Sequence, residues 1–380
     1  MKKKILIVTE RRADYSKFRP IIKEIEKSKK LDYGLVVTGS HLLKEYGYTI
    51  NEIKQDKFKI LAEFDMYPKN RNNTNAEMVR AFAKAIVRLS KIVEKIKPDI
   101  ILAGFDIGAN FAIAIIGAHM NTIVAHLEGG EVTGTIDESI RHATTKFSHI
   151  HFVTNKEAAK RVIKMGENPK LVFIVGNPSL DNIKNIKNIP IKELEKKFGI
   201  DFLKPYGIVL KHTVTSEIEI VDKNIKKTLD AVMESGIQSI LIHGNADAGS
   251  RKISKIVKNS KVKQFSALTF NEYINLLKRS SVLVGNSSSG IMEAPFLGIP
   301  SVNIGSRQAG RLRASSVIDV DYDKNQIKKA INIAINSKKF LSKIKKSKNL
   351  YGNGNSAKKI VQILEKLDLE KIPIQKKMEY

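Results

Sequence analysis

The sequence predicts an α/β fold with two doubly wound domains and a cleft between them. Short apolar runs alternate with helical patterns along most of the chain, which is typical of parallel βαβ units. The pattern breaks at Gly176, Asn177 and Pro178 and then begins again. A chain of 380 residues is also too long for one hydrophobic core, so two domains are the natural expectation.

The first domain is predicted to span residues 1–178. Its expected strands are the apolar runs at residues 5–8, 33–37, 59–64, 100–103, 123–127, 150–153 and 172–175. The longest helical pattern between them runs from about residue 76 to residue 96. Pro98 ends it, because proline disfavours helix at the residue before it.

The second domain is predicted to span residues 190–355. It follows a polar stretch rich in asparagine and lysine, where we place the domain boundary. Its expected strands lie at residues 206–210, 239–242, 262–265, 282–284 and 301–304. A last helical pattern lies in the C-terminal segment, residues 356–380, which is expected to pack back on the first domain.

The composition argues against several classes of protein. No apolar run approaches the ~20 residues of a membrane span, and the apolar part of the basic N-terminus is too short for a signal peptide. The absence of cysteine excludes disulfides and thiolate metal sites and fits a cytoplasmic protein. The net charge is +27, but the lysines are spread over helical patterns without interleaved aromatic residues. Neither a membrane nor a nucleic acid is therefore an expected partner.

The segment 126–142 is the richest in chemistry, with four carboxylates, two histidines, one arginine and three glycines. Glu128 follows an apolar run, so it is expected at the carboxyl end of a strand. An amphipathic pattern comes next, with Asp137 or Ser139 available as its helix cap. Asp106 also follows an apolar run, which places three acids at the sheet edge where α/β proteins bind ligands. Neighbouring carboxylates push each other's pKa apart, which supplies one acid and one base.

Other polar residues at strand ends complete the predicted cleft. Arg12 and Ser16 follow the first strand, where they can meet a phosphate at a helix start. The small residues of segment 285–293 open a helical pattern through Phe296 and are predicted to hold a diphosphate, although the Gly-Lys-Thr of a P-loop is missing. Glu293, one turn into that helix, is placed to accept hydrogen bonds from ribose hydroxyls.

Two further segments are assigned to the second-domain wall. His212 follows the strand at 206–210 and can exchange a proton near neutral pH. The arginines of segment 305–311 can clamp a nucleotide or remain solvated. The residues alone thus indicate an enzyme that handles a nucleotide diphosphate-linked substrate with carboxylates and no metal cluster.

Together these segments resemble the UDP-N-acetylglucosamine 2-epimerase family. The resemblance covers nearly the whole chain. The matching segments are residues 12–17, 37–42, 126–142, 245–250, 285–293 and 305–310. The motif from Gly134 to His142 is similar to the hydrolysing branch, which makes N-acetylmannosamine and UDP for sialic acid synthesis. The resemblance implies two Rossmann-like domains in a glycosyltransferase-B-like arrangement, a UDP-sugar substrate and no cofactor. We also expect a homo-oligomer, a dimer or tetramer.

The resemblance implies a two-step reaction. A base removes the proton at C2 while UDP leaves from C1, and water then adds to the 2-acetamidoglucal to give the inverted C2 centre. The catalytic residues implied by position are Asp106, Glu128, Asp137 and His212. The predicted substrate-binding residues are Arg12, Ser16, Glu131, Arg141, Asn245, Ser287, Ser288, Glu293 and Arg307.

The chain departs from the family pattern beside the first acid. The family commonly has Gly-Asp-Arg-Phe there, whereas this chain has Phe105, Asp106, Ile107 and Gly108. The aspartate is kept and the arginine is lost, so the sugar or phosphate contact of that arginine is not expected. Branches that act on related sugars, including a 2,4-diacetamido sugar, differ in such details, and such a sugar stays open as the substrate.

Two alternatives from other classes follow from the same residues. A glycosyltransferase on this scaffold could also use segment 285–293, but it would not need three acids on the first wall. A nucleic-acid-binding protein would use the +27 charge, and its binding would fall steeply with salt. It would leave the acids of segment 126–142 as an unexplained repulsive cluster.

Overall fold

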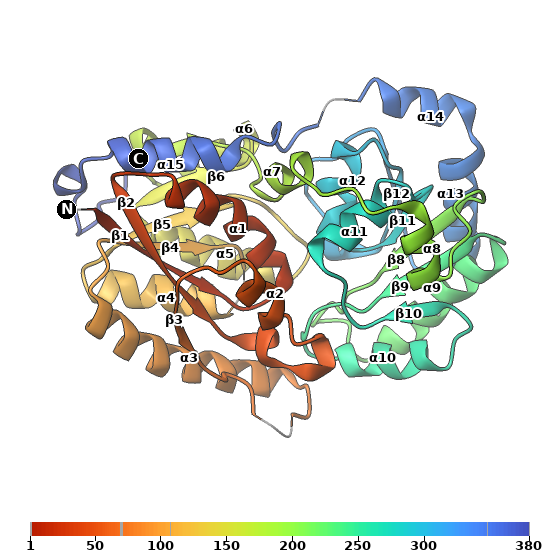
Figure 1. Ribbon diagram of the computed structural model, residues 1–380, viewed down its shortest axis with the longest axis horizontal. Helices are drawn as coiled ribbons and strands as arrows, with labels where there is room; N and C mark the ends of the chain where they lie inside the picture. The colour runs from red at the N-terminus through yellow and green to blue at the C-terminus, as the bar shows by residue number, and fades with distance from the viewer. Residues whose placement is uncertain (1, 69–70, 107, 348, 380) are drawn as a thin grey trace.

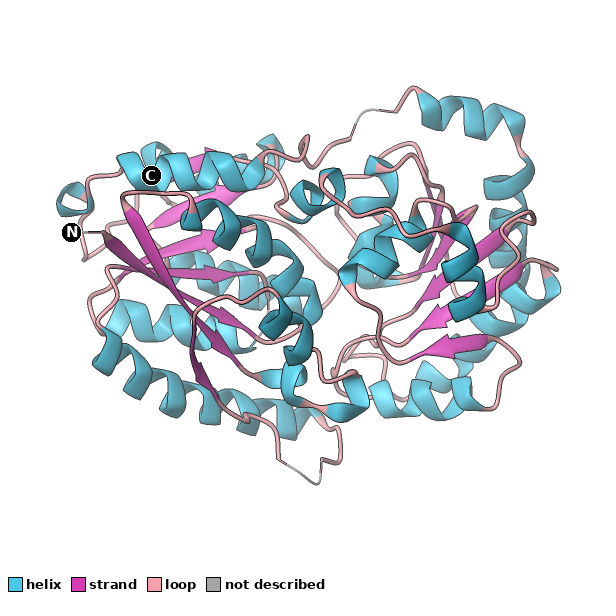
Figure 2. Cartoon of the chain, in the orientation of Figure 1, coloured by secondary structure: helices cyan, strands magenta, loops and turns pink. Residues whose placement is uncertain are grey.

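The computed structural model describes residues 2–68, 71–106, 108–347 and 349–379, which form two α/β domains side by side (Figure 1). The first sheet has seven strands in the order β3-β2-β1-β4-β5-β6-β7, and the second has six in the order β10-β9-β8-β11-β12-β13. Neighbouring strands run parallel in both sheets, and helices cover both faces of each (Figure 2). The predicted fold class is confirmed.

The strands are β1 (Lys3–Thr9), β2 (Leu31–Val37), β3 (Ile60–Glu63), β4 (Ile100–Gly104), β5 (Ile123–Leu127), β6 (Ile150–Val153), β7 (Val172–Ile174), β8 (Tyr206–Leu210), β9 (Gln238–Ile242), β10 (Lys263–Phe265), β11 (Val282–Gly285), β12 (Ser301–Ile304) and β13 (Val317–Val320). The helices are α1 (Arg12–Glu26), α2 (Ile50–Gln55), α3 (Asn75–Ile96), α4 (Gly108–His119), α5 (Ile136–Phe147), α6 (Lys156–Lys164), α7 (Ser179–Lys184), α8 (Ile191–Phe198), α9 (Val221–Glu234), α10 (Ser250–Lys258), α11 (Phe270–Leu277), α12 (Glu293–Phe296), α13 (Lys324–Asn336), α14 (Lys338–Lys345) and α15 (Ser356–Lys366). The short 3-10 helices are η1 (Gly39–Leu42), η2 (Lys44–Tyr46), η3 (Pro169–Leu171), η4 (Ser288–Gly290), η5 (Ser306–Gln308) and η6 (Leu369–Lys371).

The central strands are buried on both faces, which explains why they read as continuous apolar runs. In β1, Ile5 and Ile7 face the core under α1 and α15, whereas Leu6 and Val8 face the core under α3 and α4. This alternation follows from the two-residue period of a strand. All four side chains are at most 1% exposed, so helices must cover both sides of the sheet.

The structure corrects two details of the sequence prediction. Strand β13 was missed because it is a half-buried edge strand whose apolar run is interrupted by Asp319. The helical pattern predicted to run through Phe296, with Glu293 one turn into it, is two short pieces, the one-turn η4 and the four-residue α12, and Glu293 is the first residue of α12.

The chain crosses between the domains at two adjacent points. Asn177 lies at the first crossing and Tyr351 at the second. The Asn177 backbone N–H donates to the Tyr351 carbonyl oxygen at 2.7 Å. After the second crossing, α15 returns to the first domain and lies along α1 (Figure 1). Ile360 and Leu364 of α15 are buried in the same core as Phe18.

Gly130 is the glycine on which the packing of α6 depends. Its φ is +75°, and a Cβ there would lie 2.3 Å from the carbonyl oxygen of Ala158. Gly166 has a similar φ of +82°, but a Cβ there would first meet the flexible end of Met378, at 3.0 Å. We predict that Gly166→Ala costs about 1 kcal/mol in unfolding free energy through backbone strain. Gly130→Ala should cost roughly 1–3 kcal/mol more through overpacking. Urea denaturation of the two variants tests this, and equal losses would contradict the close approach.

Candidate active site

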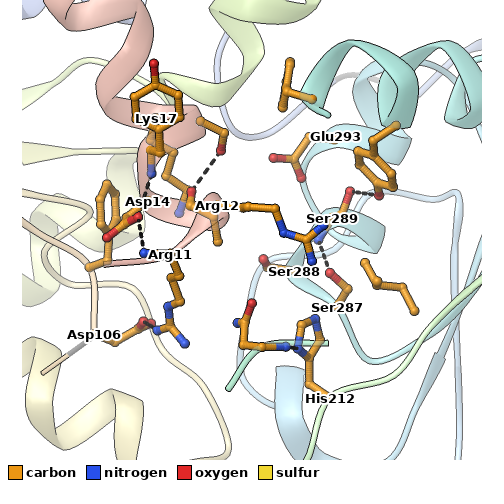
Figure 3. Close-up of a pocket in the computed structure, with 18 of the residues that line it drawn as sticks. Arg11, Arg12, Asp14, Lys17, Asp106, His212, Ser287, Ser288, Ser289 and Glu293 are labelled. Atoms are coloured by element: carbon orange, nitrogen blue, oxygen red, sulfur yellow. Dashed lines mark hydrogen bonds and ion pairs between the residues drawn. The ribbon is translucent and has the colours of Figure 1, made fainter. Parts of the chain in front are cut away.

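The carboxyl ends of both sheets face one cavity between the domains (Figure 3). Most of the predicted site residues line it, although they come from both halves of the chain. They are Arg12, Ser16, Asp106, Glu128, Asp137, His212, Asn245, Ser287, Ser288, Glu293 and Arg307. Glu131 and Arg141 do not line the cavity.

Asp106 follows β4 and is held by two arginines. Its Oδ1 accepts from Arg11 Nη2 at 3.1 Å, and its Oδ2 accepts from Arg141 Nη2. Burial alone would raise the pKa of Asp106, but Arg141 and Arg11 together hold it well below its usual value. The two arginines therefore favour the ionised form of Asp106. Ile107, the residue at which the family arginine is missing, lies outside the described residues.

Glu128 follows β5, as predicted, in a left-handed conformation with φ +61°. A non-glycine residue with this φ is strained, and such strain is concentrated at functional sites. Its Oε2 accepts from Lys17 Nζ at 2.7 Å, and that ammonium also lies 4.3 Å from the ring centroid of Phe105. Its Oε1 is buried, with no hydrogen-bond partner among residues 2–68, 71–106, 108–347 and 349–379. One oxygen of a fixed carboxylate is thus available to a substrate.

Asp137 lies in the first turn of α5, but it is not the helix cap. The cap is Thr135, whose hydroxyl accepts from the Asp137 backbone N–H at 3.3 Å, so the expectation of Asp137 or Ser139 as cap was wrong. Burial raises the pKa of Asp137, and the nearby Asp106 raises it further. Arg307 Nη2 opposes this from 3.8 Å across the cleft. Asp106 and Asp137 therefore form the predicted pair of carboxyls with opposite pKa shifts.

The structure places Glu131 and Arg141 behind the cavity wall, where the predicted direct contact with substrate is not available to them. Glu131 is buried and accepts from the side chains of Thr154 and Asn155. Arg141 is fully buried, and its Nη1 donates to the Glu131 carbonyl oxygen at 2.9 Å while its Nη2 bonds to Asp106. Arg141 lies on the buried face of α5 with Thr144 and Thr145, so its side chain points inward. Arg141 thus holds Asp106, and the Glu131 carbonyl oxygen holds Arg141.

His212 follows β8 and is held as a neutral ring. Burial lowers its pKa well below the usual value, and Arg307 and Arg11 lower it further. Its Nδ1 accepts from the Asn245 backbone N–H at 3.4 Å. We infer that the single ring proton is on Nε2, because the hydrogen bond at one ring nitrogen sets the tautomer. His212 can then donate a hydrogen bond to an oxygen in the cavity.

The small residues of segment 285–293 form the wall beside His212 (Figure 3). Ser287 Oγ accepts from the Ser289 backbone N–H at 3.2 Å. Glu293 is 9% exposed and lines the cavity, with its Oε1 accepting from Ser179 Oγ at 2.6 Å. Ser179 directly follows the first domain crossing, and no sequence signal marked it as a partner of Glu293. Because Ser179 occupies one oxygen, the other is left for a ligand.

Sequence reasoning also missed two cationic residues of the first wall, Lys17 and Arg11. Arg11 Nη1 lies 3.3 Å from Asp247 of the second domain, while its Nη2 bonds to Asp106. Arg12, its neighbour, reaches across to the His243 carbonyl oxygen at 3.4 Å. Their place directly after β1 was the available signal. By contrast, the Ser16 hydroxyl donates to the Ala13 carbonyl oxygen at 2.9 Å, within its own helix.

The two domains are in direct contact at the rim of the cavity. The Gly134 backbone N–H donates to the Arg307 carbonyl oxygen at 3.1 Å, and Arg311 Nε donates to the Val132 carbonyl oxygen at 3.0 Å. A Cβ at Gly134 would lie 2.1 Å from the carbonyl oxygen of Ser306. Only glycine permits this approach, so the cleft is closed and the two walls face each other at bonding distance.

The described residues show neither a metal cluster nor a membrane-spanning helix. There is no group of three or more His, Asp or Glu side chains there that could hold a metal ion. Nor does a helix of that part of the chain combine the length and apolarity needed to cross a membrane.

The sequence model of a protein family, described as UDP-N-acetylglucosamine 2-epimerase, matches residues 23–365 of this chain. The chain belongs to this family. A 2-epimerase from Neisseria meningitidis, named for UDP-N-acetylglucosamine, is 35% identical over 342 residues, which are 89% of each protein. A relative from Legionella pneumophila named UDP-N,N'-diacetylbacillosamine 2-epimerase (hydrolyzing) is 34% identical over 373 residues, 97% of each protein.

Solved structures of the epimerase family share the fold. The crystal structure of UDP-GlcNAc 2-epimerase from Neisseria meningitidis bound to UDP-GlcNAc superposes with a TM-score of 0.82 at 20% identity. The match covers 96% of this chain and all of the other. The glycosyltransferase-B-like arrangement implied by the sequence is therefore confirmed.

The electrostatics of the acids predict opposite pKa changes at Asp137 in two variants. Arg307→Met removes a cation that stabilises the carboxylate, so the pKa of Asp137 should rise. Asp106→Asn removes a neighbouring negative charge, so the same pKa should fall. Carbon-13 NMR titration of labelled aspartate carboxyls, with Asp137→Asn used for assignment, measures both changes. Shifts of the same sign in the two variants would contradict the coupling.

Proposed function

We propose that this protein is a hydrolysing 2-epimerase that converts UDP-N-acetylglucosamine into N-acetylmannosamine and UDP. The observation that carries the proposal is the cavity between the two walls. On its first wall, the pKa shifts of Asp106 and Asp137 are opposite, and Glu128 keeps one buried oxygen without a partner among the described residues. On its second wall, a neutral histidine, small hydroxyl residues and Glu293 suit a nucleoside diphosphate. The motif from Gly134 to His142 favours the hydrolysing branch.

In the first step, Glu128 is the base. Its Oε2 is fixed by Lys17, and its free Oε1 takes the proton from C2 of the sugar. The electron pair of the C2–H bond forms the C1=C2 double bond, and the C1–O bond breaks so that UDP leaves. His212 donates from Nε2 to the leaving phosphate oxygen. The products of this step are a 2-acetamidoglucal and UDP.

In the second step, Asp137 is the acid. Its raised pKa favours the protonated form, and we assign to it the delivery of a proton to C2 on the face opposite to the one that lost its proton. Water then bonds to C1 and gives a proton back to Asp137, while Glu128 loses its proton to solvent. Asp106 stays ionised between Arg11 and Arg141 and supplies fixed negative charge beside the reacting centre.

The nucleotide is assigned to the second wall. Ser287 and Ser288 are proposed to meet the diphosphate, with Arg12, Asn245 and Arg307 around it. The free oxygen of Glu293 is proposed to accept from the ribose hydroxyls, because Ser179 fixes the carboxylate with one edge toward the cavity. A related sugar, a UDP-linked diacetamido sugar, is the second candidate, since the Legionella relative bears that name.

Product analysis tests the reaction. The protein incubated with UDP-N-acetylglucosamine in deuterated water should give UDP and N-acetylmannosamine carrying deuterium at C2, because the original proton is lost to Glu128. Proton NMR reads both the product and the label, and UDP-N,N'-diacetylbacillosamine in a parallel incubation distinguishes the two sugars. Protium at C2 of the product would rule out the elimination step.

The role of Glu128 predicts a large and selective loss. Glu128→Gln keeps the shape of the side chain but cannot take a proton, so turnover should fall by about 10²–10⁴-fold. The Kd for UDP should change little, because Glu128 lies on the first wall. Glu157→Gln is the control, since Glu157 is half exposed on α6 and outside the cavity. Calorimetry and turnover assays measure both quantities, and near-normal turnover of Glu128→Gln would remove it as the base.

A further inference from the structure

Four residues at the acid side of the cavity carry buried polar atoms that have no hydrogen-bond partner in the described part of the chain. These atoms are Glu128 Oε1, Thr133 Oγ1, Gln308 Oε1 and Arg311 Nη1, and all four residues line the cavity. Buried polar atoms are nearly always paired in folded proteins. The mechanism above accounts for Glu128 and leaves the other three unexplained.

Thr133 and Arg311 come from opposite domains but from loops that touch. The loop of Thr133 bonds to the loop of Arg311 through Arg311 Nε and the Val132 carbonyl oxygen, at 3.0 Å. A Cβ at Gly310 would lie 3.1 Å from a methyl group of Val132. Gln308 is on the same loop as Arg311 and is 1% exposed. The three unpartnered atoms therefore gather where the two domains meet.

Each of the three residues is also held in place by a second contact. Gln308 Nε2 donates to the Asn286 carbonyl oxygen at 2.9 Å, so its amide oxygen is directed by that bond. Arg311 is 6% exposed and fixed through Nε. The Thr133 backbone N–H donates to Glu138 Oε2 at 2.7 Å. Donors and acceptors held this way are pre-organised for a ligand, because binding requires little further ordering.

The three atoms offer the hydrogen-bond donors and acceptors that a secondary amide needs in its binding site. Gln308 Oε1 can only accept, Arg311 Nη1 can only donate, and a threonine hydroxyl can do both. An amide presents an N–H donor and, on its opposite side, a carbonyl acceptor, so it needs partners at two separate places. A sugar hydroxyl at the same position would leave some of these buried groups unpaired, which costs affinity.

We propose that Thr133, Gln308 and Arg311 form the subsite that binds the C2 acylamino group of the sugar and so determine substrate specificity. Arg311 donates to the acyl oxygen, and Gln308 accepts from the amide N–H. The assignment to C2 follows from Glu128. Its Oε1 is the fourth unpartnered atom on this side of the cavity, and in the proposed mechanism it acts on the C2 proton. The inference rests on the proposed function. Holding the acylamino group here turns the C2–H bond toward Glu128.

The test compares two non-reacting ligands that differ only at C2. In both, CH2 replaces the oxygen between C1 and phosphorus, so UDP cannot leave. One carries the acetamido group of N-acetylglucosamine, and the other carries the hydroxyl of glucose. Calorimetry gives the Kd of each ligand and of UDP for every variant. The ratio of the two sugar Kd values measures recognition of the acylamino group alone.

The wild-type protein should bind the acetamido ligand more tightly than the hydroxyl ligand. Arg311→Met should reduce that preference by roughly ten- to hundredfold, because it removes a hydrogen bond from a charged donor. Gln308→Leu and the nearly isosteric Thr133→Val should each reduce it by about two- to tenfold. The Kd for UDP should stay unchanged in all three. Arg279→Met is the control, since Arg279 bonds to Asn275 and Asn188 and does not line the cavity.

The possible results separate this inference from the proposed function. Failure of the wild-type protein to bind UDP would overturn both. If UDP binds and the preference for the acetamido ligand is absent, or persists in Arg311→Met and Thr133→Val, the subsite assignment is wrong while the proposed function stands. An equal loss of affinity for UDP and both sugars would show a structural role and would also overturn the assignment.

Discussion

The site depends on contact between the two domains at the rim of the cleft. The backbone bond from Gly134 to Arg307 and the reach of Arg311 to Val132 join the acid-bearing loop to the second domain. Without this contact, Arg307 would not lie near Asp137, and Arg311 would not lie among the first-wall acids. Closure therefore determines the electrostatics of the acids as well as the shape of the cavity. Glycine at position 134 is required because any Cβ would meet the opposite backbone.

Closure also explains how like charges are tolerated in a confined space. Arg11 lies between Asp106 of the first domain and Asp247 of the second, at 3.1 and 3.3 Å. Burial lowers the pKa of an arginine, but these carboxylates outweigh it and raise the pKa of Arg11 above its usual value. The guanidinium is thus charged whenever the domains are together. Together with Arg141 it holds the pKa of Asp106 low, whereas burial and the charge of Asp106 raise the pKa of Asp137 despite the opposing charge of Arg307.

Much of the fold and many residues of the cavity could be predicted from the sequence. Strands β5, β6, β8 and β12 have their predicted bounds. A buried parallel strand has a continuous apolar sequence that ends in polar residues, so its limits are visible in the sequence. The same rule placed Asp106, Glu128 and His212 at the cavity. It failed for β13, an edge strand, and for segment 285–296, where a helical pattern folds as two short pieces.

Residues whose role depends on the other domain could not be predicted. Ser179 bonds to Glu293, more than 100 residues away, and Arg11 bonds to Asp247, so no local pattern marks either pair. Arg141 was expected at the substrate, yet the turn of α5 directs it inward to Asp106. Sequence spacing identifies strand ends, but the direction of a side chain within a loop or helix turn is set by packing.

Small-angle scattering tests the dependence on closure most directly. The radius of gyration of the wild-type protein with UDP bound should be that of the closed arrangement, in which Gly134 contacts Arg307. Gly134→Ala should bind UDP and keep its secondary structure, yet show a larger radius of gyration under the same conditions, because its Cβ would meet the Ser306 carbonyl oxygen before the domains touch. An equal radius of gyration in the two proteins would contradict a site assembled by contact between the domains.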